Sequence, residues 1–303
     1  MAARVAVVVN PTSGRGRAAR ILPQVEPRLA ALPADVMVSD GPDHAAKLAR
    51  DAAAGGAEIV VAMGGDGMIG MVGGALVGTT ATLGIIPTGT GNDFAVALGY
   101  GKRRPVDAVA LLRDPSVLEI DAARVTWEGG DRLYLNVAGT GFDSEVTEAA
   151  NRMRTRVQGT AKYVAAVFRT LPGFRAGRFE IDVDGTGHTL PGMMIAVGNG
   201  KSYGGGMKIT PGASFTDGLL DLTVIGAMSK PEFVRSFPTV FRGTHVNHPK
   251  VTTLRGARIE ITADRPFEVY ADGERCGPLP ATFEIVPKAL RVVVPRTVRG
   301  EMG

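Results

Sequence analysis

The stretch Ile59-Val60-Val61-Ala62-Met63-Gly64-Gly65-Asp66-Gly67 decides the fold of the first half of the chain. Its apolar run predicts a strand, and the glycines after it predict a tight turn into a helix over 68–78. Open α/β proteins bind ligands at such turns, which lie at the carboxyl end of a parallel sheet. Glycine lets backbone N–H groups approach a phosphate closely, and the following helix directs its positive end there. By itself, one such turn is weak evidence for a ligand.

Strand and helix patterns alternate on both sides of this turn. Apolar runs at 4–9, 35–38 and 83–86 predict three further strands. Helical spacing of apolar residues occurs between them, in the groups Ile21, Val25, Leu29, Leu32 and Ala45, Leu48, Ala49, Ala52, the second in a helix that opens near Pro42 and Asp43. This alternation predicts an α/β domain with a mainly parallel sheet. We place it at residues 1–118, with 295–303 as a candidate addition.

Two of the other strands also end in loops of small residues. Asn10-Pro11-Thr12-Ser13-Gly14 follows the first strand, and Thr88-Gly89-Thr90-Gly91-Asn92-Asp93 follows the strand at 83–86. We expect all three loops to meet at one edge of the sheet. Turn formation explains this joint pattern poorly, although Asn92 and Asp93 would also cap a following helix. The chain has neither a Gly-x-x-x-x-Gly-Lys-Ser/Thr sequence nor protein kinase signatures, so a nucleotide site here would be of another design.

The second half of the chain has a different pattern of short strands separated by turns. The candidates are 122–127, 132–138, 178–183, 193–197, 220–224, 258–262, 267–271, 282–286 and 290–294. A helical insertion at roughly 143–170 interrupts them. We therefore predict a β-rich second domain at residues 119–294.

The composition is that of a folded protein, with 45% hydrophobic and 21% charged residues. The single cysteine, Cys276, excludes an intramolecular disulfide and fits a reducing compartment. The apolar start of the chain is too short for a signal peptide, and the uncharged stretch 67–87 is too rich in glycine and threonine to span a membrane. We therefore expect a cytoplasmic protein without a transmembrane helix.

The basic residues are distributed unevenly, although the net charge is only +4. The stretch 149–179 contains no acidic residue, and apolar side chains such as Tyr163, Val167 and Phe168 are interleaved with its basic ones: Arg152, Arg154, Arg156, Lys162, Arg169, Arg175 and Arg178. Such a segment would suit anionic lipid headgroups. A solvated helix face explains it equally well. Nucleic acid is not an expected partner, because no nucleic-acid-binding module accompanies the charge.

Taken together, the loops resemble those of the diacylglycerol and sphingoid-base kinases, which include bacterial lipid kinases. The resemblance covers nearly the whole chain and rests on five stretches in a common order: Asn10-Pro11-x-Ser13-Gly14, Gly64-Gly65-Asp66-Gly67, Pro87-Thr88-Gly89-Thr90-Gly91-Asn92-Asp93-Phe94-Ala95, Asp217-Gly218-Leu219-Leu220-Asp221 and Asp272-Gly273-Glu274. It implies a nucleotide-binding α/β domain, a β-sandwich-like second domain and an active site between them.

The resemblance also implies an activity, namely transfer of the γ-phosphate of ATP to the hydroxyl of a lipid, most simply diacylglycerol. Asp66 and Glu274 would be catalytic, with Glu274 as the general base. Asp217 would bind Mg²⁺ together with the backbone of Ser214 and Leu219. The nucleotide would be held by Asn10, Pro11, Thr12, Ser13, Gly14, Ser39, Gly64, Gly65, Asp66, Gly67, Met68, Thr90 and Asn92.

Two alternatives to a lipid kinase remain open. The first is a kinase whose acceptor is a soluble molecule such as NAD or a sugar, because Gly-Gly-Asp-Gly also occurs in NAD kinases. Met68 stands where the family usually has threonine, and Gly70 and Met71 stand where bacterial members tend to have Asn and Glu. These departures leave open a binding protein that has lost turnover, although Asp66, Asn92, Asp217 and Glu274 are all retained. The basic stretch favours the lipid kinase, located peripherally at the inner face of the membrane, and a homodimer is left open.

Four other conspicuous residues are interpreted as structural. His245 and His248 are three positions apart, but the neighbouring Gly243 and Pro249 predict a loop rather than a metal-binding helix. Trp127 and Tyr134 are predicted to be packed aromatic residues rather than parts of a lipid pocket.

Overall fold

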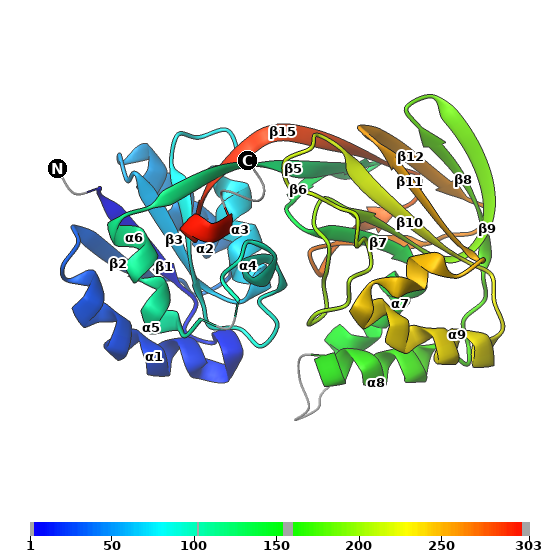
Figure 1. Ribbon diagram of the computed structural model, residues 1–303, viewed down its shortest axis with the longest axis horizontal. Coiled ribbons are helices and arrows are strands. Elements are labelled where there is room, and N and C mark those ends of the chain that lie inside the picture. Colours follow the sequence, from blue (N-terminus) through cyan, green and yellow to red (C-terminus); the bar gives the residue numbers. More distant parts are fainter. Residues whose placement is uncertain (1–2, 102, 154–159, 299–303) are drawn as a thin grey trace. The chain divides into compact units, whose positions relative to one another are not determined.

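The computed structural model describes residues 3–101, 103–153 and 160–298 (Figure 1). The chain forms two compact units, the first made of Met1–Ala122 and Pro287–Gly303 and the second of Ala123–Val286. The chain passes from one unit to the other within two long strands, β5 (Ser116–Trp127) and β15 (Ala281–Val294). The position 118/119, where we drew the domain boundary from the sequence, lies inside β5.

The first unit contains a parallel sheet, in the order β15-β4-β3-β1-β2. Its other strands are β1 (Val5–Val9), β2 (Ala34–Val38), β3 (Ile59–Gly64) and β4 (Thr82–Pro87). Every residue of β1, β3 and β4 is buried, as expected of strands covered on both faces. The predicted mainly parallel α/β architecture is therefore confirmed.

Helices follow the parallel strands. They are α1 (Ser13–Leu29), α2 (Pro42–Ala54), α3 (Asp66–Leu76), α4 (Asp93–Ala97), α5 (Pro105–Ala108) and α6 (Ala110–Arg113). The predicted apolar faces are buried, with Val25 and Leu29 on α1 and Ala45 and Ala49 on α2. The glycine-rich turn after β3 leads directly into α3, and the loop after β4 leads into α4.

The second unit is built from antiparallel strands, consistent with the predicted β-rich domain. They are β6 (Gly130–Tyr134), β7 (Val137–Gly141), β8 (Gly177–Val183), β9 (Thr186–Gly198), β10 (Leu220–Gly226), β11 (Val251–Gly256), β12 (Arg258–Ala263), β13 (Glu268–Ala271) and β14 (Glu274–Pro278), with parts of β5 and β15. The long β9 joins two groups of strands. Its first half pairs with β8, and its second half lies between β7 and β10.

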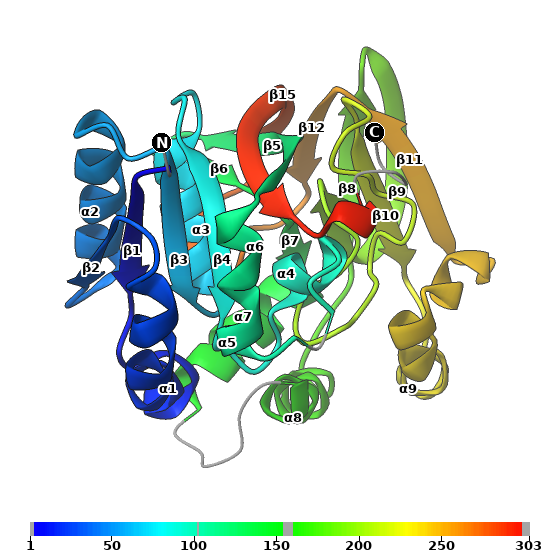
Figure 2. The same cartoon turned by 60° about the vertical axis from the view of Figure 1, so that its left-hand side comes forward.

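The described residues of the second unit include five short helices. They are α7 (Phe142–Arg152), α8 (Thr160–Thr170), α9 (Lys230–Ser236) and the 3₁₀ helices η1 (Phe237–Arg242) and η2 (Thr244–Asn247). The predicted helical insertion corresponds to α7 and α8. The segment from α9 to η2 was not predicted, because its helices are short and interrupted by Pro238 and Gly243. Figures 1 and 2 both show α8 and α9 at the lower end of this unit.

Aromatic side chains fill much of the core of the second unit. Phe142 packs edge-on against Phe174 and Phe233, with ring centroids 5.0 and 5.2 Å apart. The interpretation of Trp127 and Tyr134 as packed residues is confirmed, since Tyr134 is 1% exposed and Trp127 packs against this core. No helix in the described part of the chain is long and apolar enough to cross a membrane.

Candidate nucleotide and phosphoryl-transfer site

The three glycine-bearing loops of the first unit contact one another at the carboxyl edge of the parallel sheet. A Cβ atom added to Gly14 would lie 2.3 Å from the carbonyl oxygen of Thr88, and one added to Gly89 would lie 2.6 Å from Gly65 Cα. These approaches are too close for any side chain, so glycine is required at both contacts. The predicted convergence of the loops is thus observed.

The first loop is held in shape by Asn10. Its Oδ1 accepts hydrogen bonds from the N–H of Thr12 at 3.0 Å and from the Thr12 hydroxyl at 2.8 Å. The backbone then turns through left-handed conformations at Gly14, Arg15 and Gly16, with φ of 59°, 61° and 76°. Left-handed backbone is uncommon for a residue such as arginine, so this turn is imposed by its surroundings.

Asp66 connects the central turn to the third loop. Its Oδ1 accepts a hydrogen bond from the N–H of Phe94, in the first turn of α4, at 3.0 Å. Burial raises the pKa of Asp66, and hydrogen bonds from the backbone, first that of Phe94, act in the opposite direction. Whatever its part in chemistry, this carboxyl group fixes the geometry of the loop.

Asn92 closes the third loop on itself. Its Oδ1 accepts from the N–H of Gly89 at 2.9 Å, and its Nδ2 donates to the carbonyl oxygen of Gly89 at 3.0 Å. The interpretation that the Asn92 side chain caps α4 is therefore wrong. It makes no capping hydrogen bond, because it is bound to Gly89 while Asp66 accepts from the first turn of the helix. Thr90 is exposed at the tip of this loop.

Two other predicted nucleotide-binding side chains are directed into the protein. Ser39 is 4% exposed, and its hydroxyl donates to the carbonyl oxygen of Val9 at 3.1 Å. Met68 is 3% exposed, and its Cβ lies 2.3 Å from where Gly64 would carry a Cβ. The side chain of Met68 therefore packs beneath the turn, and the missing hydroxyl is replaced by an apolar contact.

The second unit contains an acidic loop around Asp217. Asp217 Oδ1 accepts from the N–H of Leu219 at 3.2 Å, and Oδ2 forms an ion pair with Arg255. Arg255 also donates through Nε to Asp221 at 3.1 Å. Burial raises the pKa of Asp221, and the positive charge of Arg255 opposes that shift. One guanidinium thus pairs with two carboxyl groups.

The Asp217 loop offers oxygen ligands of the type that Mg²⁺ prefers. They are the carboxylate of Asp217 and the backbone carbonyls of Ser214 and Leu219, and Mg²⁺ commonly takes only one or two carboxylates and keeps several waters. Within the described residues, no group of three or more His, Cys, Asp or Glu side chains is arranged to hold a metal. The donor types of the loop fit Mg²⁺, and the one carboxylate among them, that of Asp217, is paired with Arg255. The assignment of Mg²⁺ to this loop stays a prediction.

Glu274 lies at the start of β14, directly after the Asp272–Gly273 turn. Both turn residues have positive φ, 49° and 85°, as in a type I′ hairpin. The carboxylate of Asp272 accepts from the N–H groups of Leu135 at 2.7 Å and Asn136 at 3.1 Å, which anchors the hairpin. Glu274 itself is exposed, and its carboxylate has no hydrogen bond or ion pair with any described residue.

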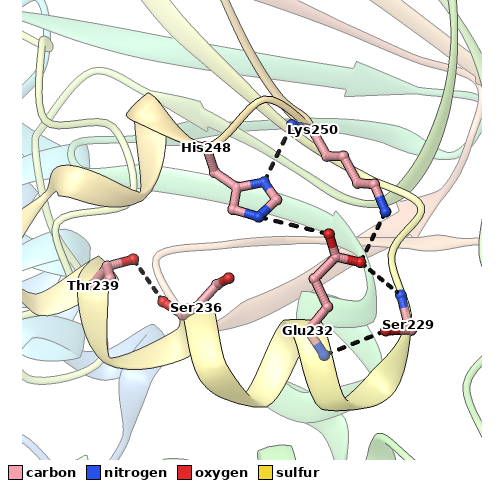
Figure 3. Close-up of polar contacts among 6 residues, drawn as sticks. All are labelled: Ser229, Glu232, Ser236, Thr239, His248 and Lys250. Carbon is pink, nitrogen blue, oxygen red and sulfur yellow. Dashed lines mark hydrogen bonds and ion pairs between the residues drawn. The ribbon is translucent and has the colours of Figure 1, made fainter.

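The remaining reactive side chains have structural surroundings. Burial raises the pKa of the Cys276 thiol to about 11, so it stays protonated at neutral pH. His245 Nε2 donates to the carbonyl oxygen of Ile209 at 3.1 Å, and His248 Nδ1 accepts from the N–H of Lys250 at 3.2 Å (Figure 3). The two rings have separate partners, which agrees with their interpretation as structural.

Sequence comparisons agree with this division of the chain. Residues 4–125 match the family described as the diacylglycerol kinase catalytic domain, and residues 136–294 match the YegS C-terminal NAD kinase beta sandwich-like domain. The chain belongs to the bacterial diacylglycerol kinase and YegS-like lipid kinase family. A protein named diacylglycerol kinase from Mycobacterium tuberculosis (strain ATCC 25618 / H37Rv) is 38% identical over 97% of this chain and 96% of its own length.

More distant members of the lipid kinase family span the chain as well. The diacylglycerol kinase of Bacillus subtilis (strain 168) is 30% identical over 97% of both chains. The fold is shared with a crystal structure described as a putative diacylglycerol kinase from Bacillus anthracis, with a TM-score of 0.79 and 23% identity over 97% of this chain and 96% of that one. The recognition of the family from its motifs is thus confirmed, as is the two-part fold.

Sequence reasoning missed that one face of α8 is turned into the second unit. Tyr163 and Val167 belong to a stretch for which the sequence left open a face toward lipid headgroups or toward solvent, but they line a cavity inside the second unit. Val167 is only 2% exposed, whereas Phe168 is 49% exposed. Helical spacing alone would have separated these two faces of α8. Arg154 and Arg156 lie outside the described residues.

Proposed function

We propose that this protein transfers the γ-phosphate of ATP to the hydroxyl of a lipid, most simply converting diacylglycerol to phosphatidic acid. The observation that supports this most directly is the mutual contact of the three glycine-bearing loops at the end of a parallel sheet. Such a surface presents backbone N–H groups and helix N-termini to phosphate, while the family supplies the lipid substrate class.

Backbone groups would do most of the nucleotide binding. The Ser13 hydroxyl lies 3.7 Å from the Cβ positions of both Gly64 and Gly65, so it belongs to the junction of two loops. The N-terminus of α3 begins at Asp66, directly after Gly65. Loops that lack bulky side chains let phosphate oxygens reach these donors. Because the side chains of Ser39 and Met68 are buried, they would support the loops, and only the backbone of these residues would contact the nucleotide.

Glu274 would act as the general base. It would take the proton of the lipid hydroxyl while that oxygen forms a bond to the γ-phosphorus and the bond to the ADP oxygen breaks. Mg²⁺ held by Asp217 and the carbonyls of Ser214 and Leu219 would supply positive charge to phosphate groups. Asp272 positions Glu274, because its carboxylate anchors the hairpin that carries it.

A membrane-peripheral location follows from the substrate, since diacylglycerol is held in a bilayer. The exposed side chains of α8 include Phe168 and Arg169, an aromatic and a basic residue of the kind found at membrane surfaces. We therefore propose peripheral contact through this helix.

A transfer assay tests the proposal. Radiolabelled ATP with Mg²⁺ should label diacylglycerol in mixed vesicles and leave NAD unlabelled. Glu274→Gln should lower kcat by 10²- to 10⁴-fold, in the usual range for a general base, with little change in the KM for ATP. Labelling of NAD alone would contradict the lipid assignment. Binding of ATP without phosphate transfer to any lipid would favour the alternative of a binding protein that has lost turnover, for which Met68 is the motivating residue.

A further inference from the structure

The loop after β2 lies beside the first loop of the candidate nucleotide site. Among the described residues, β2 is the last strand of the parallel sheet, and it pairs with β1 so that Val38 lies opposite Val9 (Figure 2). The next residue, Ser39, donates to the carbonyl oxygen of Val9 through its N–H at 2.8 Å and through its hydroxyl at 3.1 Å. The loop therefore leaves the sheet one strand spacing, about 4.8 Å, from the loop that begins at Asn10.

Asp40 presents its carboxylate to solvent in this loop. The side chain is 84% exposed, and its Oδ1 lies 2.6 Å from His44 Nδ1. The backbone nitrogen of Asp40 lies 3.2 Å from the same ring atom. Because a carboxylate oxygen only accepts, the shorter contact requires that Nδ1 carries a proton. His44 thus holds one carboxylate oxygen, and Oδ2 has no hydrogen bond or ion pair with any other described residue.

The backbone around Asp40 is constrained on both sides. Ser39 is bound to Val9, and α2 begins at Pro42, whose ring fixes the backbone angle φ. Gly41, which lies between them, is extended, and a Cβ atom added to it would meet no atom within 4 Å. The surface at Gly41 therefore leaves room for a ligand, while the sheet and the helix hold the backbone that carries the carboxylate.

The charges at the start of α2 do not suit a phosphate group. Asp43, in the first turn, already balances the positive end of that helix, and Asp40 adds a second negative charge. Lys47, the first lysine or arginine of α2, is paired with Asp51 at 2.6 Å. Phosphate groups would thus bind at the glycine-bearing loops. The ribose of a nucleotide is uncharged, and its hydroxyl groups can donate to a carboxylate oxygen.

The same order of a glycine-rich loop and an acidic residue occurs in other nucleotide-binding folds. In doubly wound α/β proteins that bind dinucleotides, a glycine-rich loop after the first strand holds the phosphates, and an acidic residue about 20 positions further along the chain accepts from a ribose hydroxyl. Here the loop after β1 ends at Gly16, and Asp40 stands 24 positions later, after β2. The topology therefore supports the same role as the charges and contacts of Asp40.

From these observations we propose that Asp40 binds a ribose hydroxyl of ATP and that His44 positions the carboxylate for this contact. The inference rests on the proposed function, since it assumes that the glycine-bearing loops hold the phosphate groups. It deepens that function by naming a residue that selects ribonucleotides over deoxyribonucleotides. The structural alternative, in which Asp40 and His44 only stabilise the start of α2, predicts an effect on unfolding and none on the choice of nucleotide.

Calorimetric binding of nucleotides in the absence of lipid tests the ribose contact. Wild type should bind ATP about tenfold more tightly than at least one of 2′-dATP and 3′-dATP, as expected for one hydrogen bond to a charged group. Asp40→Ala should bind ATP about tenfold more weakly than wild type and that deoxynucleotide within about twofold of wild type. The matched control is Asp51→Ala, which removes the acid of another i,i+4 pair near the far end of α2. It should keep the wild-type preference.

Variants of His44 test the positioning role. His44→Ala should lose part of the preference for ATP, and His44→Asn, which keeps an N–H donor near the position of Nδ1, should restore it. An unchanged preference in His44→Ala would overturn the positioning role. In the transfer assay, Asp40→Ala should raise the KM for ATP about tenfold and leave kcat unchanged, because the ribose contact is the same in the ground state and the transition state.

The outcomes separate this inference from the proposed function. If wild type binds ATP and both deoxynucleotides equally, or if Asp40→Ala weakens all three alike, the ribose contact is wrong and the nucleotide site stands. If wild type binds none of the three, the nucleotide site and the ribose contact are both wrong. If the preference for ATP is present and is lost in Asp40→Ala but no lipid is phosphorylated, the ribose contact stands and the kinase function fails.

Discussion

The Asp66 carboxylate accepts a hydrogen bond from the backbone N–H of Phe94 at 3.0 Å, across 28 positions of sequence. It thereby joins the turn after β3 to the helix after β4, two of the three loops of the candidate nucleotide site. A residue that the family motif marks as catalytic is thus also a structural support. Replacing it will change geometry as well as charge.

Variants of Asp66 should separate these two roles. Asp66→Asn keeps an oxygen that accepts from Phe94, so its free energy of unfolding should stay within about 0.5 kcal/mol of wild type. Asp66→Ala removes the acceptor at the start of α4 and should cost about 1 kcal/mol. Urea unfolding measures both. If kinase activity is lost in Asp66→Asn as fully as in Asp66→Ala, the charge is required. Full activity in Asp66→Asn would show that Asp66 has only a structural role.

The contact between Gly89 and Gly65 should be intolerant of any side chain. Gly89→Ala places a methyl group 2.6 Å from Gly65 Cα, so the backbone must shift. We expect a loss of about 1–3 kcal/mol in unfolding free energy, as is usual for overpacking, and at least tenfold weaker ATP binding by calorimetry. Gly74→Ala is the control, since its Cβ meets no atom within 4 Å and lies inside α3. It should stabilise the protein by about 0.5–1 kcal/mol. Normal ATP binding by Gly89→Ala would contradict the assignment of these loops to the nucleotide site.

Asp143 should make stability depend on pH. Burial raises its pKa in the folded protein, so its favourable protonated state is present below the unfolded pKa and is lost as pH rises through the folded one. Asp143→Asn keeps the oxygen that accepts from Tyr163 and Tyr203 but does not ionise. Its unfolding free energy relative to wild type should therefore increase from pH 4 upward. Urea titrations at pH 4 to 8 measure this, and a constant difference would show that Asp143 titrates normally.

Glu232 should have the opposite pH dependence. The hydrogen bond from Lys250 lowers its pKa, so its contribution is present above the unfolded pKa and is lost as pH falls through the folded one. The wild-type unfolding midpoint should drop toward that of Glu232→Gln below about pH 4.5, the ordinary range of a glutamate. Glu260→Gln, on β12, serves as a comparison variant outside the 229–250 segment. An unchanged gap between wild type and Glu232→Gln down to pH 3 would contradict the assignment.

Membrane contact through α8 should depend on its exposed basic residues. Flotation with vesicles that contain phosphatidylglycerol should recover wild-type protein, and Arg169→Glu should reduce binding at least about fivefold, given roughly 1 kcal/mol per basic residue near an anionic surface. Arg20→Glu makes the same change at an exposed position of α1 and should bind normally. Equal loss in both variants would indicate a general charge effect instead of a docking helix.

The sequence alone determined the two-part architecture, the parallel sheet and the convergence of three loops. These features depend on local patterns: apolar runs such as Ile59–Met63, helical spacing in α1 and α2, and glycines at strand ends. Parallel connectivity then forces the carboxyl ends of the strands to one edge, so the meeting of the loops follows without knowledge of side-chain contacts. The family followed from the same motifs.

Only the tertiary structure decided what individual side chains do. Met68 packs beneath its turn, Asn92 binds Gly89 and leaves the start of α4 to Asp66, and Tyr163 turns inward to a cavity. Two of these outcomes depend on partners far away in sequence, because Asp66 lies 28 positions before Phe94 and Tyr163 lies 40 positions before Tyr203. Local spacing cannot specify such pairs, because they form only when separate strands and helices have packed together.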